Sequence, residues 1–156
     1  AKALVVGLAT RLAAELSPND PRVAEAAFRA ARDNRHEARY LGLEALGHVG
    51  TPEAIEVVLD AAKNDRDAYV RGSAYTGVAN AKRFDLLPRL RALLAKEGSQ
   101  AVRSEGDEAI KKLEQMEAEA KAKRGKKGGE QERAEAVGRP REQRQGGESR
   151  GRPRPR

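Results

Sequence analysis

The chain reads DNRHEARYLGLEAL at residues 33–46, DRDAYVRGSAYTGV at residues 65–78 and EGSQAVRSEGDEAI at residues 97–110. Each stretch begins with an acidic residue and has an arginine six residues later, so the whole pattern recurs at a step of 32 residues. Small residues keep the same register, as at Gly42, Ala74 and Gly106. A fixed period of this length is typical of stacked repeat proteins, which usually act by presenting a surface rather than by catalysis.

Helical spacing extends in both directions from these stretches. Val5, Leu8, Leu12 and Leu16 are spaced i, i+3, i+7 and i+11, which predicts a first helix. The same reasoning along the chain predicts six further helices, the last of them without a partner. Their expected limits are about 21–32, 38–49, 52–62, 68–79, 85–96 and 100–123.

The composition divides the chain at about residue 124. Residues 125–156 hold 10 basic and 5 acidic residues, and their apolar side chains besides proline are only two alanines and one valine. Such a segment buries too little surface to offset its chain entropy. We therefore expect a folded domain at residues 1–124 and a disordered, basic, Arg/Gly/Pro-rich tail at residues 125–156.

Roughly residues 1–116 resemble the HEAT repeat family in its short bacterial form. Val70-Arg71 and Val102-Arg103 match the V-R step of that family, and residues 45–55 look like its turn between helices. The first repeat departs from the pattern because Gly7 stands where an arginine is expected. The resemblance implies an all-α, right-handed α-solenoid of about three HEAT-like helix pairs plus a terminal helix, followed by the tail.

The recurring acid and arginine pairs have two interpretations. In the first, the arginines form an anion-binding row. In the second, each arginine bonds the acid of its own or of the next repeat and forms a structural ladder between stacked helices, as the resemblance implies. The recurrence of both partners in register favours the structural ladder. Its residues are Asp33, Arg39, Asp65, Arg71, Glu97 and Arg103.

The second helix of each pair lines the inner face of a HEAT solenoid. In this chain, the polar residues of the second helices alternate in sign from one helix to the next. A groove that follows a phosphate backbone should be basic throughout, whereas a banded face suits a protein partner of mixed charge. An ordinary solvated surface is the alternative. The candidate partner-binding residues are Arg22, Arg29, Glu53, Glu56, Asp60 and Arg89.

The sequence assigns no catalytic residue, no cofactor and no metal ligand. It has no cysteine, and its single His36-Glu37 step is too little for the two-metal site of deoxyhypusine hydroxylase, a HEAT-repeat enzyme that uses several such steps. Sequence motifs of zinc proteases, serine hydrolases and P-loop proteins are missing. No apolar run reaches the length of a membrane span. We predict a non-catalytic protein-interaction scaffold in the cytoplasm.

Two alternatives to this prediction stay open. Residues 150–154 resemble the core of an AT-hook, so Arg150, Arg152 and Arg154 are candidates for weak nucleic-acid contact in an A·T minor groove, against a merely solubilising tail. The chain also suits the C-terminal HEAT-like region of a larger enzyme such as a zinc aminopeptidase. The missing initial methionine and the apolar run at residues 4–6, which would be an exposed end of the stack, favour that reading.

Overall fold

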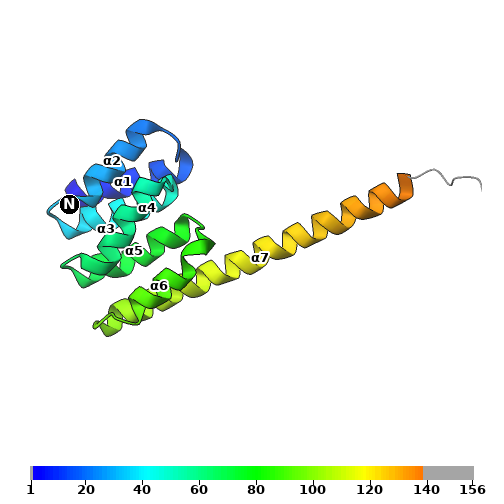
Figure 1. The fold of residues 1–156 in the computed structure, drawn as a ribbon. Coiled ribbons are helices and arrows are strands. Elements are labelled where there is room, and N and C mark those ends of the chain that lie inside the picture. The colour runs from blue at the N-terminus through cyan, green and yellow to red at the C-terminus, as the bar shows by residue number, and fades with distance from the viewer. Residues whose placement is uncertain (1, 139–156) are drawn as a thin grey trace, which may run out of the picture. The chain divides into compact units, whose positions relative to one another are not determined.

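The computed structural model describes residues 2–138, and within that range it contains helices and no strand. The first six α-helices form three consecutive pairs, and a seventh follows them (Figure 1). The expected all-α fold of about three helix pairs plus a terminal helix is therefore confirmed. The elements are α1 (Lys2–Leu16), α2 (Pro21–Ala31), α3 (His36–Val49), α4 (Pro52–Asn64), α5 (Ala68–Asn80), the 3₁₀ turn η1 (Phe84–Leu86), α6 (Leu87–Leu94) and α7 (Gln100–Gly138).

The helix starts follow from simple capping chemistry. The side chains of Asp20 and Thr51 accept hydrogen bonds from main-chain N–H groups at the starts of α2 and α4, and a proline follows each cap. Gly50 adopts a left-handed conformation with φ 66° and ends α3. These local signals fix the limits of the pairs before any tertiary packing is considered.

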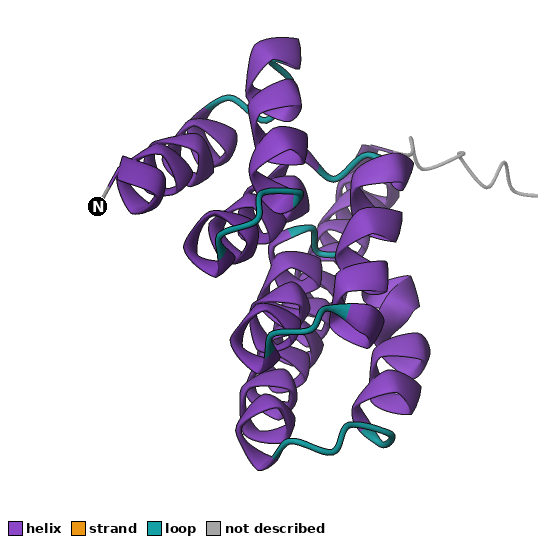
Figure 2. Cartoon of the chain, turned by 90° about the vertical axis from the view of Figure 1, so that its left-hand side faces the viewer, coloured by secondary structure: helices purple, strands orange, loops and turns teal. Residues whose placement is uncertain are grey.

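The first helices of the pairs stack in a row, and both helices of each pair contribute to the core. Helix α3 packs between α1 and α5, and the second helices α2 and α4 lie against α3 and α5 (Figures 1 and 2). The core consists mainly of Ala, Leu, Val and Ile side chains, with Tyr75 as its largest fully buried member. Burial raises the pKa of Tyr75 to about 12.

The recurring small residues mark places where backbones approach closely. A Cβ atom at Gly42 would lie 2.3 Å from the main-chain nitrogen of Ala31, and one at Gly47 would lie 2.0 Å from the carbonyl oxygen of Gly77. At Gly106 a Cβ atom would instead lie 2.5 Å from a side-chain atom, Cδ1 of Leu94 in α6. Helices α2 and α3, and α3 and α5, thus pack at distances that larger side chains would prevent.

The first helix is present as predicted, but the apolar stripe that predicts it faces away from the stack. Helix α1 buries Gly7, Thr10 and Ala14. Val5 and Leu8 are 64% and 45% exposed. The exposed end expected at residues 4–6 is therefore observed, and it extends along the whole helix.

The last helix is longer than the sequence predicts. It continues past the expected end near residue 123 to Gly138, and so passes through Gly125 and Gly128. Most of the residues around these glycines are strong helix formers such as Glu, Lys, Arg, Gln and Ala, which offset a cost of about 1 kcal/mol for each glycine. This corrects the expected end of the helix.

By internal contacts the chain divides into two units, Ala1–Lys121 and Ala122–Arg156. The disorder expected for residues 139–156 lies outside the described residues.

Candidate interaction surface

The arginines of the 32-residue pattern bond two repeats with different edges of the guanidinium group. The Nε and Nη2 atoms of Arg39 donate to the two carboxylate oxygens of Asp65, in the next repeat, at 3.0 and 3.2 Å. Its Nη1 atom donates to the main-chain oxygens of Asp33 and Asn34, in the turn before α3, at 3.1 and 2.9 Å. Arg39 therefore joins its own turn to the acid 26 residues ahead.

The next repeat has the same arrangement. Arg71 binds both carboxylate oxygens of Glu97 at 2.9 and 3.0 Å, and its Nη1 donates to the main-chain oxygen of Asp65 at 3.0 Å. The arginine side chain is 19% exposed and the glutamate side chain 9%. Two-point pairing of this kind fixes the orientation of both groups. The geometry supports the interpretation of these residues as a ladder between helices.

Each acid of the ladder also accepts a hydrogen bond from the main chain two residues later. The bond shapes the turn before the following helix, so one carboxylate serves both the local turn and the neighbouring repeat. The three bonds run from Arg35 to Asp33, from Asp67 to Asp65 and from Ser99 to Glu97, at 2.9, 2.9 and 2.8 Å.

The ladder ends at both of its outer members. Gly7 occupies the arginine position of the first repeat, and the carboxylate of Asp33 is bound by Arg35 instead, at 2.8 Å. Arg103 donates to two main-chain oxygens and to the side chain of Gln100, and it contacts no carboxylate among the described residues. Of the six predicted ladder residues, only four form carboxylate rungs.

Three of the ladder groups, Asp33, Arg71 and Glu97, are held in their charged forms. Hydrogen bonding from Arg71 lowers the pKa of Glu97 to about 2, and the same contact raises the pKa of Arg71. The pKa of Asp33 is likewise lowered, mainly by the side chain of Arg35. Groups that stay charged at every physiological pH suit a structural role and not proton transfer.

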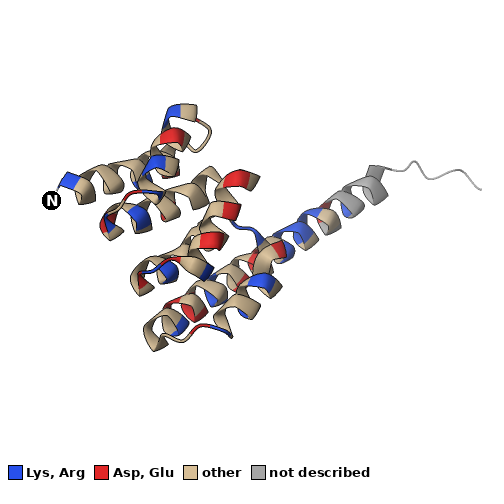
Figure 3. Ribbon diagram, turned by 60° about the vertical axis from the view of Figure 1, so that its left-hand side comes forward, with Lys and Arg blue, Asp and Glu red and all other residues tan. Residues whose placement is uncertain are grey.

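The second helices carry arginines that are already paired with acids. Arg22 and Arg29 bind Asp20 and Glu25 on or beside their own helix, at 2.8 and 2.7 Å. The banded distribution of charge predicted for this face can be followed in Figure 3. A third pair crosses from α6 to α4, where Arg89 binds Glu56 at 3.1 Å.

A groove of about 860 Å³ lies where α2 and α4 meet the turns that follow them. Along α4 the groove is lined by the acidic residues Glu56 and Asp60 and by their apolar neighbours Val57 and Ala61. Arg32, at the end of α2, also lines the groove. The ladder pair of Arg39 and Asp65 also lines it. Asn64 and Arg66 are also among the lining residues.

The sequence predicted only part of this groove. Glu56 and Asp60 belong to the predicted face, whereas Arg22, Arg29, Glu53 and Arg89 do not line the groove. The prediction missed Asn64 and Arg66. Their positions were accessible from the repeat, because each lies 32 residues after another lining residue, Arg32 and Asn34 respectively.

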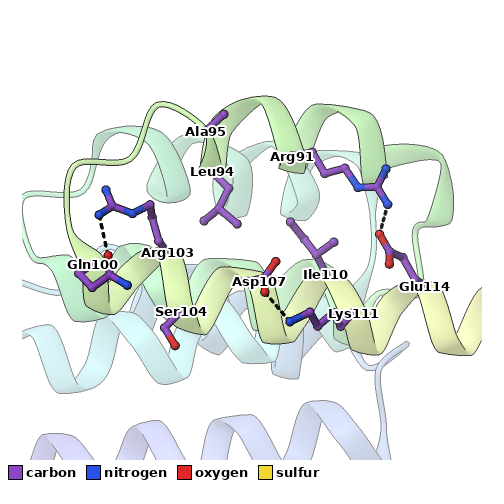
Figure 4. A pocket seen from close by; sticks show the side chains of 10 residues that line it. All are labelled: Arg91, Leu94, Ala95, Gln100, Arg103, Ser104, Asp107, Ile110, Lys111 and Glu114. Carbon is purple, nitrogen blue, oxygen red and sulfur yellow. Dashed lines mark hydrogen bonds and ion pairs between the residues drawn. The ribbon is translucent and has the colours of Figure 1, made fainter.

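A second hollow, of about 710 Å³, lies between α6 and the first part of α7 (Figure 4). Its polar side chains bind one another: Arg91 pairs with Glu114, and Lys111 lies 2.6 Å from Asp107. Leu94 and Ile110 form its apolar part (Figure 4). The outward face of α7 in this region is therefore charged and internally paired.

The described residues contain neither a metal-binding cluster nor a membrane-spanning helix. Among the side chains that the structure describes, no group of three or more His, Asp or Glu is placed to hold a metal ion. None of the helices in that range has both the length and the apolar character needed to cross a membrane. Arg150, Arg152 and Arg154 lie outside the described residues, so the nucleic-acid contact stays a prediction.

Residues 4–79 match the family model described as HEAT repeats. The match covers the first two helix pairs and nearly all of α5, and the second rung of the ladder continues the same pattern beyond it. This segment therefore carries HEAT repeats, as the resemblance predicts for it. No curated protein and no solved structure shows significant similarity to the chain.

Proposed function

We propose that this HEAT-repeat chain is a non-catalytic scaffold that binds a segment of another protein in the groove between α2 and α4. The observation that carries the proposal is the lining of that groove. The acidic side chains of Glu56 and Asp60 line one side of the groove. The basic side chains of Arg32 and Arg66 also line the groove, and so does the apolar side chain of Val57. HEAT repeats usually act through such surfaces between neighbouring helices.

The charges favour a protein segment over a nucleic acid. Glu53, Glu56 and Asp60 follow one another along the exposed side of α4 and would repel a phosphate backbone. Most arginines of the face are already neutralised by acids of the same chain, as described above. A segment with basic side chains for α4 and an acidic side chain for Arg32 would meet complementary charges along the groove.

The ladder supports this role by fixing the walls of the groove. Arg39 and Asp65 join the turn after α2 to the turn after α4, and both line the groove as well. Their side chains are 10% and 12% exposed. A surface held by a buried two-point ion pair is formed before the partner arrives, which reduces the entropy lost on binding.

Site-specific photo-crosslinking tests the proposal. A photoreactive residue at Asn64, inside the groove, should trap one partner in cells, and one at Glu108, on the exposed side of α7, should not. Asp60→Lys should remove the crosslinked product. Glu119→Lys is its matched control, because both acids are exposed and each accepts a hydrogen bond from an amide four residues away.

The outcomes separate the proposal from its alternatives. A product that survives Asp60→Lys, or identical products from both positions, would contradict a specific groove. A nucleic acid in place of a protein in the product would support the alternative of a nucleic-acid-associated chain.

A further inference from the structure

Helix α1 presents a second surface, which the proposed function does not use. Four leucines, Leu4, Leu8, Leu12 and Leu16, are spaced four residues apart and are 43%, 45%, 46% and 82% exposed. Val5 lies beside them. A contiguous exposed apolar surface of this kind marks an interaction site. Apart from these α1 residues and the neighbouring Val6, Tyr69 is the sole exposed large apolar side chain within residues 2–128.

The stripe is separate from the contact that holds α1 in the stack. The buried side of α1 consists of Gly7, Thr10 and Ala14, and at Gly7 the side chain of Leu41 in α3 approaches the helix closely. At 100° per residue, Leu8 and Leu12 lie on the opposite side of the helix from this buried set. The leucines are therefore free to contact a partner without any change in the fold.

The spacing of the leucines suits packing against an identical helix. Side chains four residues apart form a ridge on a helix, and the commonest packing of two helices places two such ridges into each other's grooves. One four-leucine ridge is complementary to a second copy of itself. We propose that two copies of this chain associate through the outward faces of their α1 helices, related by a two-fold axis.

The charges at the two ends of α1 favour an antiparallel pair. Lys2 lies at the start of the helix and Glu15 near its end, and both are exposed. In an antiparallel arrangement each lysine approaches the glutamate of the other copy. Arg11 is occupied by Glu44 of its own chain at 2.9 Å, so it does not add an unpaired charge to the interface.

The other end of the stack excludes head-to-tail association. There α7 presents Arg103, Asp107 and Lys111, which are exposed, polar and bound to nearby groups (Figure 4). Placing the leucine ridge of a second copy on this surface would desolvate charges without replacing their partners. The ridge of α1 therefore meets another α1, and association stops at two copies.

Sedimentation equilibrium of the full chain tests the proposal. A single 15-residue helix contributes less area than the roughly 800 Å² per partner of a standard interface, so we expect a Kd in the micromolar range. Over loading concentrations of about 1–200 µM, the mass should rise from 16.9 kDa toward twice that value. A mass of 16.9 kDa at every concentration would overturn the proposal and leave α1 to a different protein or repeat.

Matched variants identify the surface. Leu12→Glu should weaken the dimer at least 100-fold while preserving the circular dichroism spectrum, because the side chain makes no contact in the core. Tyr69→Glu, which places the same charge at an apolar side chain that is 55% exposed on α5, should leave the dimer unchanged. Equal losses in both variants would overturn the assignment to α1, and so would a stepwise growth of mass beyond two copies.

A charge swap tests the antiparallel orientation. Lys2→Glu should weaken the dimer a few-fold, and Lys2→Glu combined with Glu15→Lys should restore it. Failure of the double variant to restore it would overturn the antiparallel pairing. None of these positions lies in the groove between α2 and α4, so the crosslinking experiment and the dimer measurement succeed or fail independently.

Discussion

The guanidinium group of Arg71 joins two repeats because its edges face different acceptors. One edge holds both oxygens of Glu97, and the remaining nitrogen holds the main chain of the turn before its own helix. Arg39 repeats this bonding one period earlier. The period of the sequence is therefore also a period of hydrogen bonds. The two complete rungs lie between α3, α5 and the turns after α4 and α6.

Arg71→Ala should destabilise the fold by about 2–3 kcal/mol, since it leaves the poorly exposed carboxylate of Glu97 without its charged partner. Urea unfolding followed by circular dichroism measures the change. Arg103→Ala is the matched control and should cost less than about 1 kcal/mol, because Arg103 is exposed and binds no carboxylate among the described residues. Equal costs in the two variants would contradict the ladder.

The ladder should also make stability depend on acid pH. The pKa of Glu97 falls from its ordinary value of 4.5 to about 2, mainly through Arg71. A lowered pKa stabilises the folded state above pH 4.5, and this contribution is lost as the pH falls toward 2. Glu97→Gln should therefore be less stable than the unaltered chain at pH 7, and the difference should shrink between pH 4.5 and 2.

Urea midpoints at several pH values in this window test that expectation. Glu119→Gln, at an exposed position outside the ladder, is the control and should change the urea midpoint at pH 7 only slightly. A constant difference for Glu97→Gln over the whole range would mean that its carboxylate is not held by Arg71.

The sequence predicted which residues belong to the ladder but not which atoms meet. It left open whether each arginine bonds the acid of its own or of the next repeat. In the structure, a step of six residues brings the arginine to the carbonyl of Asp65, while the carboxylate of Asp65 turns to Arg39. The direction of a side chain in a turn depends on tertiary contacts, which spacing alone does not contain.

The helices show the same division between local and tertiary information. Their number and most of their limits follow from apolar spacing and from caps such as Asp20 and Thr51. Apolar spacing does not predict which way the apolar face of α1 points. The helix is buried through small residues such as Gly7 and Ala14, so its leucines face away from the stack. Hydrophobic periodicity counts large apolar side chains, so it does not identify Gly7 as a packing residue.

Substitution by alanine should have opposite effects on stability at two of the helical glycines, Gly47 and Gly125. Gly47→Ala should destabilise the fold by about 1–3 kcal/mol, since its Cβ would lie 2.0 Å from the backbone of Gly77 and would force α3 and α5 apart. Gly125→Ala meets nothing within 4 Å and should stabilise α7 by about 0.5–1 kcal/mol.

Urea unfolding measures the first effect, and ellipticity at 222 nm measures the second. A Gly125→Ala chain with unchanged helix content would support the shorter helix that the sequence predicts. An unaffected Gly47→Ala chain would mean that α3 and α5 cross elsewhere.

The buried core ends well before the end of the chain. Leu113 is its last fully buried member within the described residues. A chain ending at Lys121 should therefore keep its melting temperature to within about 3 °C, as expected for changes outside the core. A chain ending at Glu108 loses Ile110 and Leu113 and should melt at a much lower temperature. A large loss after truncation at Lys121 would show that later residues stabilise the repeats.

The candidate groove was only partly predictable from the sequence. Its acids on α4 follow from the charge pattern, because side chains on the outer face of a helix keep their helical spacing. Arg66 lies in a turn, and its place in the groove depends on the bond that it donates to the main chain of Asn34. Residues 32 apart in the chain are neighbours in a stack of this period, so the repeat itself is the best guide to such partners.

The bonding of the arginines also determines how such a chain can grow during evolution. Each 32-residue stretch brings a carboxylate for the arginine before it and an arginine for the carboxylate after it. A tandem duplication of 32 codons within this region therefore inserts a stretch that is bonded on both sides from its first generation. A shorter or longer insertion in the same place separates an arginine from its acid and exposes both. Duplication or loss of a whole stretch therefore keeps each remaining arginine beside an acid, whereas an insertion of another length does not.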